Sequence, residues 1–154
     1  ADLVPDCAIG ADVMVGFPGE GRQHFGNTLD LIRRLPLTYL HVFSYSQRDG
    51  TAALRLGDRQ TRATQRPRAR QLISLSEDKR LAFHRRFLGS SLRILVEERC
   101  SSSASAFGLA VGLSDNYVKV LFAAGEQEIA ENQFALVRIG SARQDAVFGE
   151  LESS

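Results

Sequence analysis

The chain has 154 residues, of which 44% are hydrophobic, enough to fill the core of one ordinary domain or of two small ones. No apolar run approaches the roughly 18 residues that a membrane-spanning helix needs, and no basic-then-apolar leader opens the sequence. Cys7 and Cys100 have no histidine or cysteine neighbours at metal-ligand spacing. These features argue against a disordered, membrane or secreted protein and against a metal site, so we expect a cytoplasmic location.

The formal net charge of +1 conceals an uneven distribution. Residues 55–93 carry eleven basic side chains, all arginine except Lys79, against three acidic ones, whereas residues 1–54 and 94–154 are net acidic. Guanidinium groups suit phosphates because they donate paired hydrogen bonds. The basic block therefore favours a nucleic-acid or phosphate partner over the alternative of a solvated helix surface.

The first half of the chain is expected to alternate between strand and helix. Residues 9–15 are mostly β-branched or apolar, and residues 38–44 alternate in polarity, so both segments predict strands. Between them, apolar residues recur at helical spacing, and Pro36 ends that helix: Phe25, Leu29, Ile32 and Leu35. The order strand, helix, strand predicts a right-handed crossover between two parallel strands.

Two parallel strands and one helix cannot form a closed domain. Parallel sheets are covered on both faces, and their strands have neighbours on both edges. We therefore expect residues 1–54 to be the last units of a larger α/β sheet or barrel whose earlier strands lie outside this sequence.

The middle of the chain predicts a loop followed by a helix. Residues 55–66 are polar and arginine-rich, with little to bury, and are expected to form a loop. From Pro67 to Leu88 the pattern is helical, with proline in a tolerated first-turn position and Gly89 as the stop.

After Gly89 the hydrophobic period changes from 3.6 to 2. Short strands are predicted at residues 92–97, 106–113, 117–122, 135–139 and 146–151, with a turn at 114–116, a flexible serine connection at 101–103 and a frayed tail after Leu151. Short strands without intervening helices indicate a small antiparallel barrel of the oligonucleotide-binding kind.

Three stretches carry a resemblance to a known family. They read GADVMVGFPGE at 10–20, YLHVFSYSQRDGTAA at 39–53, and LSEDKRLAFHRRFLG at 75–89 followed by GLSDNYVKV at 112–120. Together they resemble the C-terminal half of radical-SAM methylthiotransferases, which insert a methylthio group into tRNA adenosines or a ribosomal protein. The motif YLHVF-x-YS-x-R-x-GT most resembles the branch of the family that acts on N6-threonylcarbamoyladenosine beside the anticodon. The resemblance covers roughly residues 8–140.

The resemblance implies an α/β part followed by an all-β part. Residues 1–66 would form the C-terminal βαβ units of a partial TIM-like barrel, and residues 67–88 a basic connecting helix. Residues 89–151 would form an OB-like TRAM barrel that binds tRNA, and residues 152–154 a tail. The cysteines of the two 4Fe-4S clusters would lie upstream of Ala1, so the chain alone is expected to be catalytically inactive.

The candidate cofactor residues lie where the two predicted parallel strands end. Loops 16–20 and 45–51 leave the carboxyl ends of these strands, which form the functional rim of a parallel barrel. The resemblance implies that this rim contacts S-adenosylmethionine through Asp12, Met14, Gly16, Phe17, Pro18, Gly19, Glu20, Tyr45, Ser46, Arg48, Gly50 and Thr51. The alternative for loop 16–20 is an ordinary Pro-Gly turn with positive φ at glycine.

Two polar residues are expected to share a face with apolar ones. Asp12 is a candidate contact to substrate or cofactor, and its alternative is a buried carboxylate satisfied by Arg48 or by backbone. His41, in phase with Tyr39 and Phe43, is interpreted as a hydrogen-bonded core residue.

For RNA, side chains that can meet phosphate or stack on a base are chosen from the helix and the small barrel: Arg80, Arg85, Arg86, Arg93, Tyr117 and Lys119. The alternatives are a solvated helix face for the arginines and a half-buried strand aromatic for Tyr117. The net acidity of residues 94–154 is unfavourable for polyanion binding, so a local face or the preceding helix would have to carry the charge.

Four positions depart from the family pattern. Gln47, Asp49 and Ala52 replace frequent prolines, which predicts a less rigid loop, and Asn132 replaces a turn glycine but tolerates the left-handed conformation. Two other interpretations stay open: a stand-alone TRAM-like RNA-binding protein without catalytic activity, and a protein-interaction domain. The choice between threonylcarbamoyl- and isopentenyl-adenosine as substrate also stays open.

Overall fold

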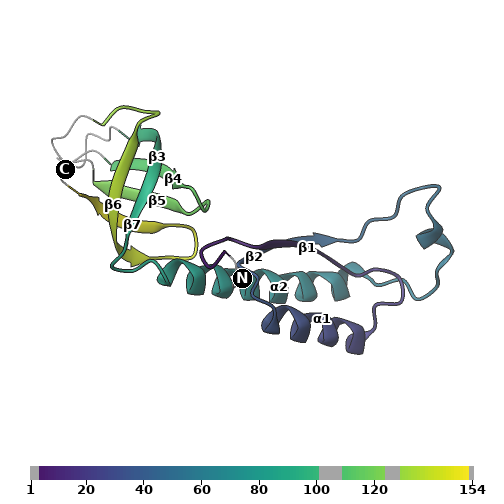
Figure 1. Cartoon of the computed structure of the whole chain (residues 1–154). Helices are drawn as coiled ribbons and strands as arrows, with labels where there is room; N and C mark the ends of the chain where they lie inside the picture. Colours follow the sequence, from purple (N-terminus) through teal and green to yellow (C-terminus); the bar gives the residue numbers. More distant parts are fainter. Residues whose placement is uncertain (1–3, 101–108, 124–128, 153–154) are drawn as a thin grey trace. The chain divides into compact units, whose positions relative to one another are not determined.

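The computed structural model describes residues 4–100, 109–123 and 129–152 (Figure 1). They fall into two compact units. The first unit is Ile9–Lys79, and the second consists of residues 4–8 together with the described residues from Arg80 onward. Within the described ranges, no helix is both long and apolar enough to cross a membrane.

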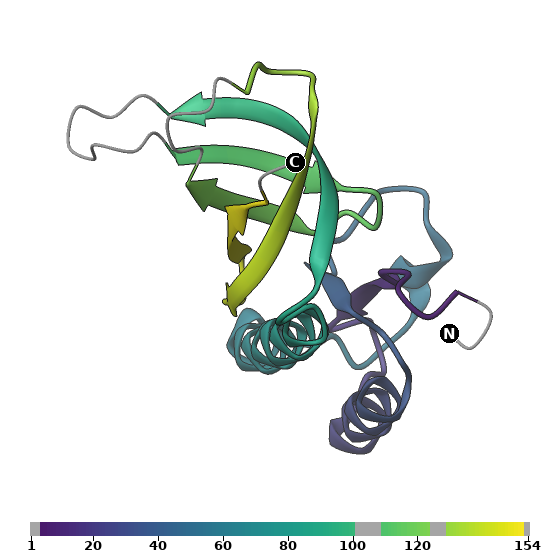
Figure 2. The same cartoon turned by 60° about the vertical axis from the view of Figure 1, so that its left-hand side comes forward.

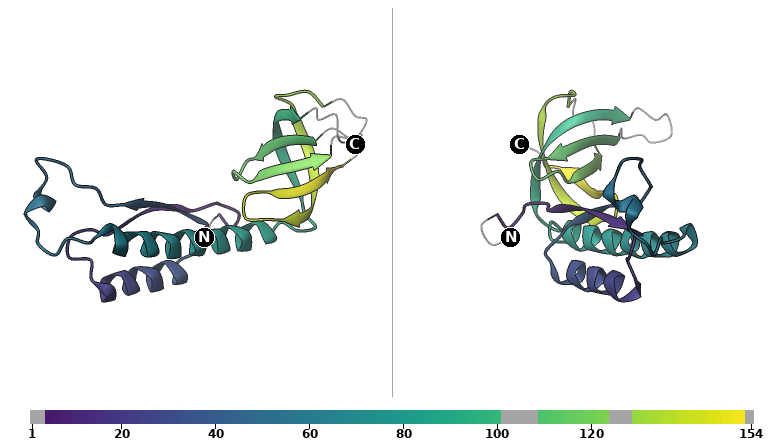
Figure 3. Two further views of the ribbon diagram at one scale, coloured as in Figure 1. Left: turned by 180° about the vertical axis from the view of Figure 1, so that it is seen from behind. Right: turned by 90° about the vertical axis from the view of Figure 1, so that its right-hand side faces the viewer.

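The first unit is a two-stranded parallel sheet with helices on one side. It contains β1 (Gly10–Val15), α1 (Arg22–Arg34), β2 (Tyr39–Ser44), the short 3-10 helix η1 (Ala52–Arg55) and the part of α2 (Arg62–Arg85) up to Lys79. The register runs from Gly10 opposite Tyr39 to Val15 opposite Ser44. Figures 1 and 3 show α1 and the first part of α2 on the same side of the strands. The predicted strand, helix, strand unit with parallel strands is confirmed.

One face of this sheet is packed and the other is open. Val15 and Leu40 point toward the helices and form a buried cluster with Phe25, Ile32 and Leu72. On the opposite face Met14 is 52% exposed and Phe43 is 51% exposed. Within the part of the chain that the structure describes, the outer edges of β1 and β2 pair with no further strand. The expected open face and unpaired edges are therefore present.

Helix α2 begins five residues earlier than its sequence pattern predicts, and residues 62–66 are helical rather than part of a loop. The hydroxyl of Thr61 accepts a hydrogen bond from the backbone N–H of Thr64 at 3.3 Å, which caps the first turn. Gln65 is buried, so tertiary packing holds the turn that precedes Pro67. At the other end, α2 gives way to a turn after Arg85, and the predicted stop at Gly89 has a φ of 77°.

The second unit is a closed five-stranded barrel, whose curved strands run across the view in Figure 2. Its strands are β3 (Ser91–Cys100), β4 (Leu109–Ser114), β5 (Lys119–Ala123), β6 (Phe134–Ala142) and β7 (Val147–Leu151), in the ring order β3-β4-β5-β7-β6. The predicted small antiparallel OB-like barrel is confirmed as a closed barrel, with the difference that one neighbouring pair, β5 and β7, runs parallel. In a ring with an odd number of strands, directions cannot alternate all the way round, so at least one neighbouring pair must be parallel.

The predicted strands all correspond to observed ones, with shifted ends. The segment expected to begin at residue 117 begins instead at Lys119, and of the predicted turn at 114–116, residues 115–116 form the turn while Ser114 ends β4. Asn132 has a φ of 65°, as its replacement of a turn glycine predicts. Three predictions fall on residues outside the described ranges. They are the serine connection at 101–103, the strand start at 106–108 and most of the tail, at 153–154.

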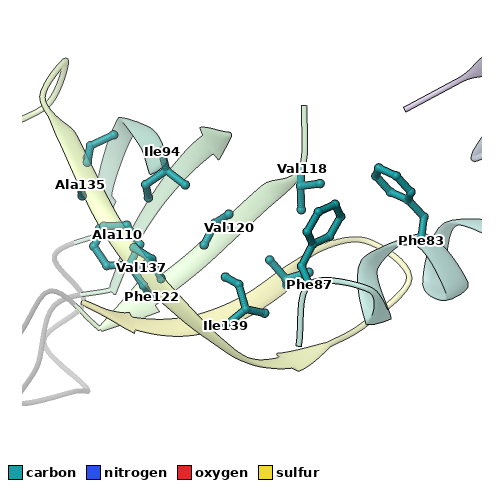
Figure 4. Close-up of a cluster of buried hydrophobic side chains, with 12 residues drawn as sticks. Phe83, Phe87, Ile94, Ala110, Val118, Val120, Phe122, Ala135, Val137 and Ile139 are labelled. Atoms are coloured by element: carbon teal, nitrogen blue, oxygen red, sulfur yellow. The ribbon is translucent and has the colours of Figure 1, made fainter. Parts of the chain in front are cut away.

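The barrel interior follows from strict alternation along its strands. In β6, Ala135, Val137 and Ile139 are buried while the residues between them are exposed. Figure 4 shows Ile94, Val120 and Val137 among the side chains of this core. Phe83 and Phe87 belong to the same cluster and meet edge to face, with ring centroids 5.2 Å apart.

His84 is a buried titratable group of this unit. Its Nδ1 lies 2.6 Å from the backbone oxygen of Arg143. Burial lowers the pKa of the His84 imidazole, since it disfavours the charged form more than the hydrogen bond to Arg143 favours it.

Candidate functional site

The loops that leave the carboxyl ends of β1 and β2 lie against one another. The backbone N–H of Tyr45 donates to the carbonyl of Val15 at 2.8 Å. The rings of Phe17 and Tyr45 meet edge to face at 5.3 Å. The two predicted cofactor segments therefore form one rim, as the parallel pairing requires.

A nearly buried ion pair fixes the first loop. Glu20 Oε2 accepts hydrogen bonds from the Gly16 N–H at 2.6 Å and from Arg68 Nη1 at 2.7 Å. The two side chains of the pair are only 12% and 11% exposed. Arg68 also donates to the backbone oxygen of Glu20 at 2.6 Å, and its guanidinium lies over the ring of Phe25. Glu20 thus holds the loop in shape, and Arg68 of α2 is its anchor.

Gln65 closes the space between the two loops. Its Nε2 donates to the backbone oxygens of Gly16 at 3.4 Å and of Tyr45 at 3.3 Å. Gly16 has a φ of 78°, and a Cβ added there would lie 2.6 Å from Gln65 Nε2. Glycine is therefore required at this position both by the backbone conformation and by the close approach of Gln65.

A cavity of about 350 Å³ opens beside this rim. It is lined by Gly16, Pro18, Tyr45, Ser46, Gln47, Arg59, Gln60, Arg62 and Gln65. The hydroxyl of Tyr45 is buried and has no hydrogen-bond partner within the described part of the chain. The two arginine side chains and the side-chain amides of this lining suit a polar ligand with acceptor oxygens, such as a carboxylate.

The open face of the sheet carries Asp12, Met14, His41 and Phe43. The alternative of a buried Asp12 satisfied by Arg48 or backbone is wrong, because Asp12 is exposed. The interpretation of His41 as a core residue is also wrong: the side chain is exposed and meets the ring of Tyr39 edge to face at 5.3 Å. Both errors have one cause, since the face that would bury these residues is uncovered.

On the barrel, one row of outward side chains crosses four strands. Phe134 of β6 lies opposite Leu95 of β3, Leu95 lies opposite Leu113 of β4, and Leu113 lies opposite Lys119 of β5. The guanidinium of Arg93 lies over the ring of Phe134, 4.1 Å from its centroid. The row borders a second cavity of about 380 Å³ lined by Arg93, Leu95, Leu113, Ser114, Asp115, Tyr117 and Phe134.

Tyr117 stands beside this row in an unusual conformation. Its side chain is 80% exposed and its φ is 61°. The alternative of a half-buried strand aromatic is therefore wrong. The turn that carries Tyr117 is fixed by the buried Ser114, whose hydroxyl donates to Asn116 Oδ1 at 2.6 Å and accepts from the Val118 N–H at 2.9 Å.

The basic residues at the end of α2 differ in their surroundings. Arg85 is exposed. Arg86 donates to Asp6 Oδ1 at 3.2 Å and to the backbone oxygen of Pro5 at 2.6 Å, so its guanidinium already holds residues of its own unit. Arg80 also has an interaction partner.

Comparison with known proteins identifies relatives of this chain. No family model matches the chain. A threonylcarbamoyladenosine tRNA methylthiotransferase of Bacillus subtilis is 34% identical over 128 residues, which is 83% of this chain and 28% of that protein. A tRNA-2-methylthio-N(6)-dimethylallyladenosine synthase of Aliarcobacter butzleri is 33% identical over 153 residues, 97% of this chain and 33% of that protein.

This chain is homologous to the C-terminal part of tRNA methylthiotransferases. It spans a quarter to a third of the length of these relatives. Relatives named for threonylcarbamoyladenosine and for dimethylallyladenosine match it at similar identity, so the similarity does not separate the two substrates. In the parts of the chain that the structure describes, no group of three or more His, Cys, Asp or Glu side chains could hold a metal ion. The chain therefore offers no described set of cysteine ligands for an iron–sulfur cluster.

Of the predicted methylthiotransferase cofactor residues, the structure brings Gly16, Pro18, Tyr45 and Ser46 together around the first cavity. The other eight lie outside its lining. Asp12 and Met14 lie on the open sheet face, while Phe17 packs on Tyr45. Gly19 and Glu20 shape the first loop, and Arg48, Gly50 and Thr51 form the next turn, where the Thr51 hydroxyl donates to the Arg48 oxygen at 2.8 Å.

Of the predicted RNA residues, the structure brings Arg93 and Tyr117 to the second cavity, and register places Lys119 beside its lining residue Leu113. Arg80, Arg85 and Arg86 lie on or just after α2. The sequence pattern gives no role to Arg59, Arg62 and Gln65, which line the first cavity from a segment whose polar composition is typical of a loop. It also missed Phe134, although the alternation of β6 places that residue on the outside.

Proposed function

We propose that this chain is the C-terminal part of an enzyme that adds a methylthio group to N6-threonylcarbamoyladenosine next to the tRNA anticodon, and that it supplies a rim of the S-adenosylmethionine pocket and the tRNA-binding module. The observation that carries the proposal is the rim itself. Two loops at the carboxyl ends of parallel strands meet around a polar cavity, where a parallel barrel keeps its functional residues.

The residues around the cavity fit S-adenosylmethionine. The guanidinium groups of Arg59 and Arg62 can hold its carboxylate, and the side-chain amides of Gln47 and Gln60 can bond its other polar atoms. When bound beside an iron–sulfur cluster, S-adenosylmethionine supplies radical chemistry. Among the described residues no group of three or more His, Cys, Asp or Glu side chains could hold such a cluster, and we expect the isolated chain to bind S-adenosylmethionine.

The alternative is a stand-alone RNA-binding protein built on the TRAM-like barrel. A pure RNA-binding module has no use for the fixed loop of Glu20 and Arg68 or for the cavity beside it. The loop motif YSQRDGT supports threonylcarbamoyladenosine over dimethylallyladenosine as the substrate.

A chimeric enzyme tests the catalytic part of the proposal. The C-terminal part of the Bacillus subtilis relative is replaced by this chain, and the modified nucleosides of tRNA from a strain without its own enzyme are measured by mass spectrometry. We expect 2-methylthio-threonylcarbamoyladenosine, reduced at least several-fold when Arg59 and Arg62 are both replaced by Gln. Replacing the exposed Arg33 and Arg34 of α1 by Gln is the charge-matched control. A folded chimera without product would refute the proposal.

Gel-shift titration of the chain with tRNA at several salt concentrations tests the RNA part. We expect affinity to fall steeply with salt, because basic side chains release counterions from phosphates. Replacing the exposed Arg85 by Glu is expected to weaken binding several-fold. Binding that does not respond to salt would contradict the role of the basic helix.

A further inference from the structure

We propose that an outer aromatic face of the barrel, formed by Arg93, Leu95, Leu113, Tyr117 and Phe134, holds unpaired bases of an RNA strand, with Tyr117 and Phe134 as the stacking side chains. The inference rests on the proposed function in one respect, namely that RNA is the partner. It adds which face is used and that the RNA is single-stranded there.

The conformation of Tyr117 is the first observation. A bulky side chain with positive φ costs roughly 1–2 kcal/mol relative to the ordinary backbone regions. Packing of the ring offsets little of this cost, because the ring is 80% exposed and contributes little to the core. The hydrogen bonds of Ser114 nevertheless hold the turn in place. Strain that is kept without a packing gain points to a ligand for the ring.

The second observation is independent of the first. Phe134 is 63% exposed, and the neighbouring Leu95 and Leu113 give it an apolar border in register across β3 and β4. The guanidinium of Arg93 lies over one face of this ring, 4.1 Å from its centroid, so the stacked pair presents a planar guanidinium surface above an aromatic one. The cavity beside these residues also reaches Tyr117. Flat aromatic and guanidinium surfaces bind unstacked bases whatever their sequence.

The local charge favours stacking over phosphate binding. Residues 94–154 carry four basic against nine acidic side chains, and Asp115 itself lines the cavity. Arg93 and Lys119 are the basic side chains of this face and its edge. Binding of a short unpaired strand here is therefore expected to depend less on salt than binding of whole tRNA.

The test compares short RNAs on the purified 154-residue chain. Fluorescence anisotropy is measured with a labelled single-stranded RNA of about eight nucleotides and with a duplex of the same sequence. The variants are Tyr117→Asn, Phe134→Ala and Arg93→Gln. The controls are Leu109→Ala, which removes another exposed apolar side chain of the barrel, and Arg138→Gln, which removes an exposed charge outside the face.

We expect Tyr117→Asn and Phe134→Ala each to weaken single-strand binding roughly 5- to 100-fold, the loss of one stacked base, and the controls to change it less than about twofold. Asparagine tolerates positive φ, so Tyr117→Asn is expected to raise the unfolding temperature by about 2–4 °C while it weakens binding. If Tyr117→Asn binds RNA more weakly and yet unfolds at a higher temperature, misfolding is excluded as the cause of the weaker binding.

Three results would overturn the inference. The first is single-strand affinity that is unchanged in Tyr117→Asn, and the second is equal affinity for duplex and single strand. The third is self-association of the chain that Tyr117→Asn abolishes, which would make the face a protein contact. In each case salt-dependent tRNA binding through α2 could persist, and the proposed function would stand. If the unmodified chain binds no RNA at all, both the further inference and the RNA part of the proposed function are refuted.

Discussion

Replacing Gly16 by alanine should destabilise the first unit by about 3–4 kcal/mol. Alanine at a φ of 78° costs roughly 1–2 kcal/mol. The new Cβ also displaces Gln65, whose two hydrogen bonds to backbone oxygens are worth about 1 kcal/mol each. The matched control is Gly19→Ala, because Gly19 has a φ of 83° and no atom within 4 Å of an added Cβ. Gly19→Ala should therefore destabilise the unit only by the roughly 1–2 kcal/mol of the unfavourable backbone conformation.

Amide hydrogen exchange followed by mass spectrometry measures this difference. Slowly exchanging amides of β2 and α1 report the free energy of opening the Ile9–Lys79 unit, and barrel amides serve as an internal control that should not change. The double variant Gly16→Ala with Gln65→Ala should cost about 2 kcal/mol less than the sum of its parts, because the side chain that clashes is gone. Equal costs for Gly16→Ala and Gly19→Ala would refute the assigned role of Gln65.

Three further predictions concern single side chains. Glu20→Gln should destabilise the first unit by about 2–3 kcal/mol in urea titrations, because Arg68 loses its nearly buried partner, whereas Asp30→Asn, at an exposed pair, should cost less than about 0.5 kcal/mol. His84 has a lowered pKa in the folded barrel, so the unfolded chain binds a proton that the folded one does not. Unfolding monitored by circular dichroism should therefore show stability that is retained above about pH 6.5 and falls as the pH drops toward the folded pKa. Asn132→Gly should change the barrel's melting temperature little, while Asn132→Ala should lower it by a few degrees, about 1 kcal/mol.

The order of elements could be predicted from hydrophobic periodicity, because each strand and helix buries one face of its own residues. Val15 and Leu40 face the helices, and Val137 faces the barrel interior, as their spacing indicates. The parallel pair β5/β7 was missed because strand direction in a closed ring depends on the number of strands, which no local pattern contains.

The start of α2 and half of the first cavity could not be predicted for a related reason. Gln65 looks like a loop residue in sequence, yet burial against Gly16 and Tyr45 keeps its turn helical. Arg62 belongs to the same turn and also lines the cavity, together with Arg59 from the loop before it. His41 differs from its prediction in the opposite direction. Its apolar neighbours predict a core residue, but this face of the sheet is uncovered and the side chain is exposed to solvent.

The two-stranded sheet of the first unit has a colloidal consequence. Within the described residues, no further strand pairs with its outer edges, although the Leu40 N–H donates to Ser76 Oγ, and the side chains of Met14 and Phe43 are exposed. Such borders recruit strands from neighbouring molecules. Concentrated solutions of this polypeptide should therefore scatter more light with time, and Phe43→Lys should slow that increase in scattering.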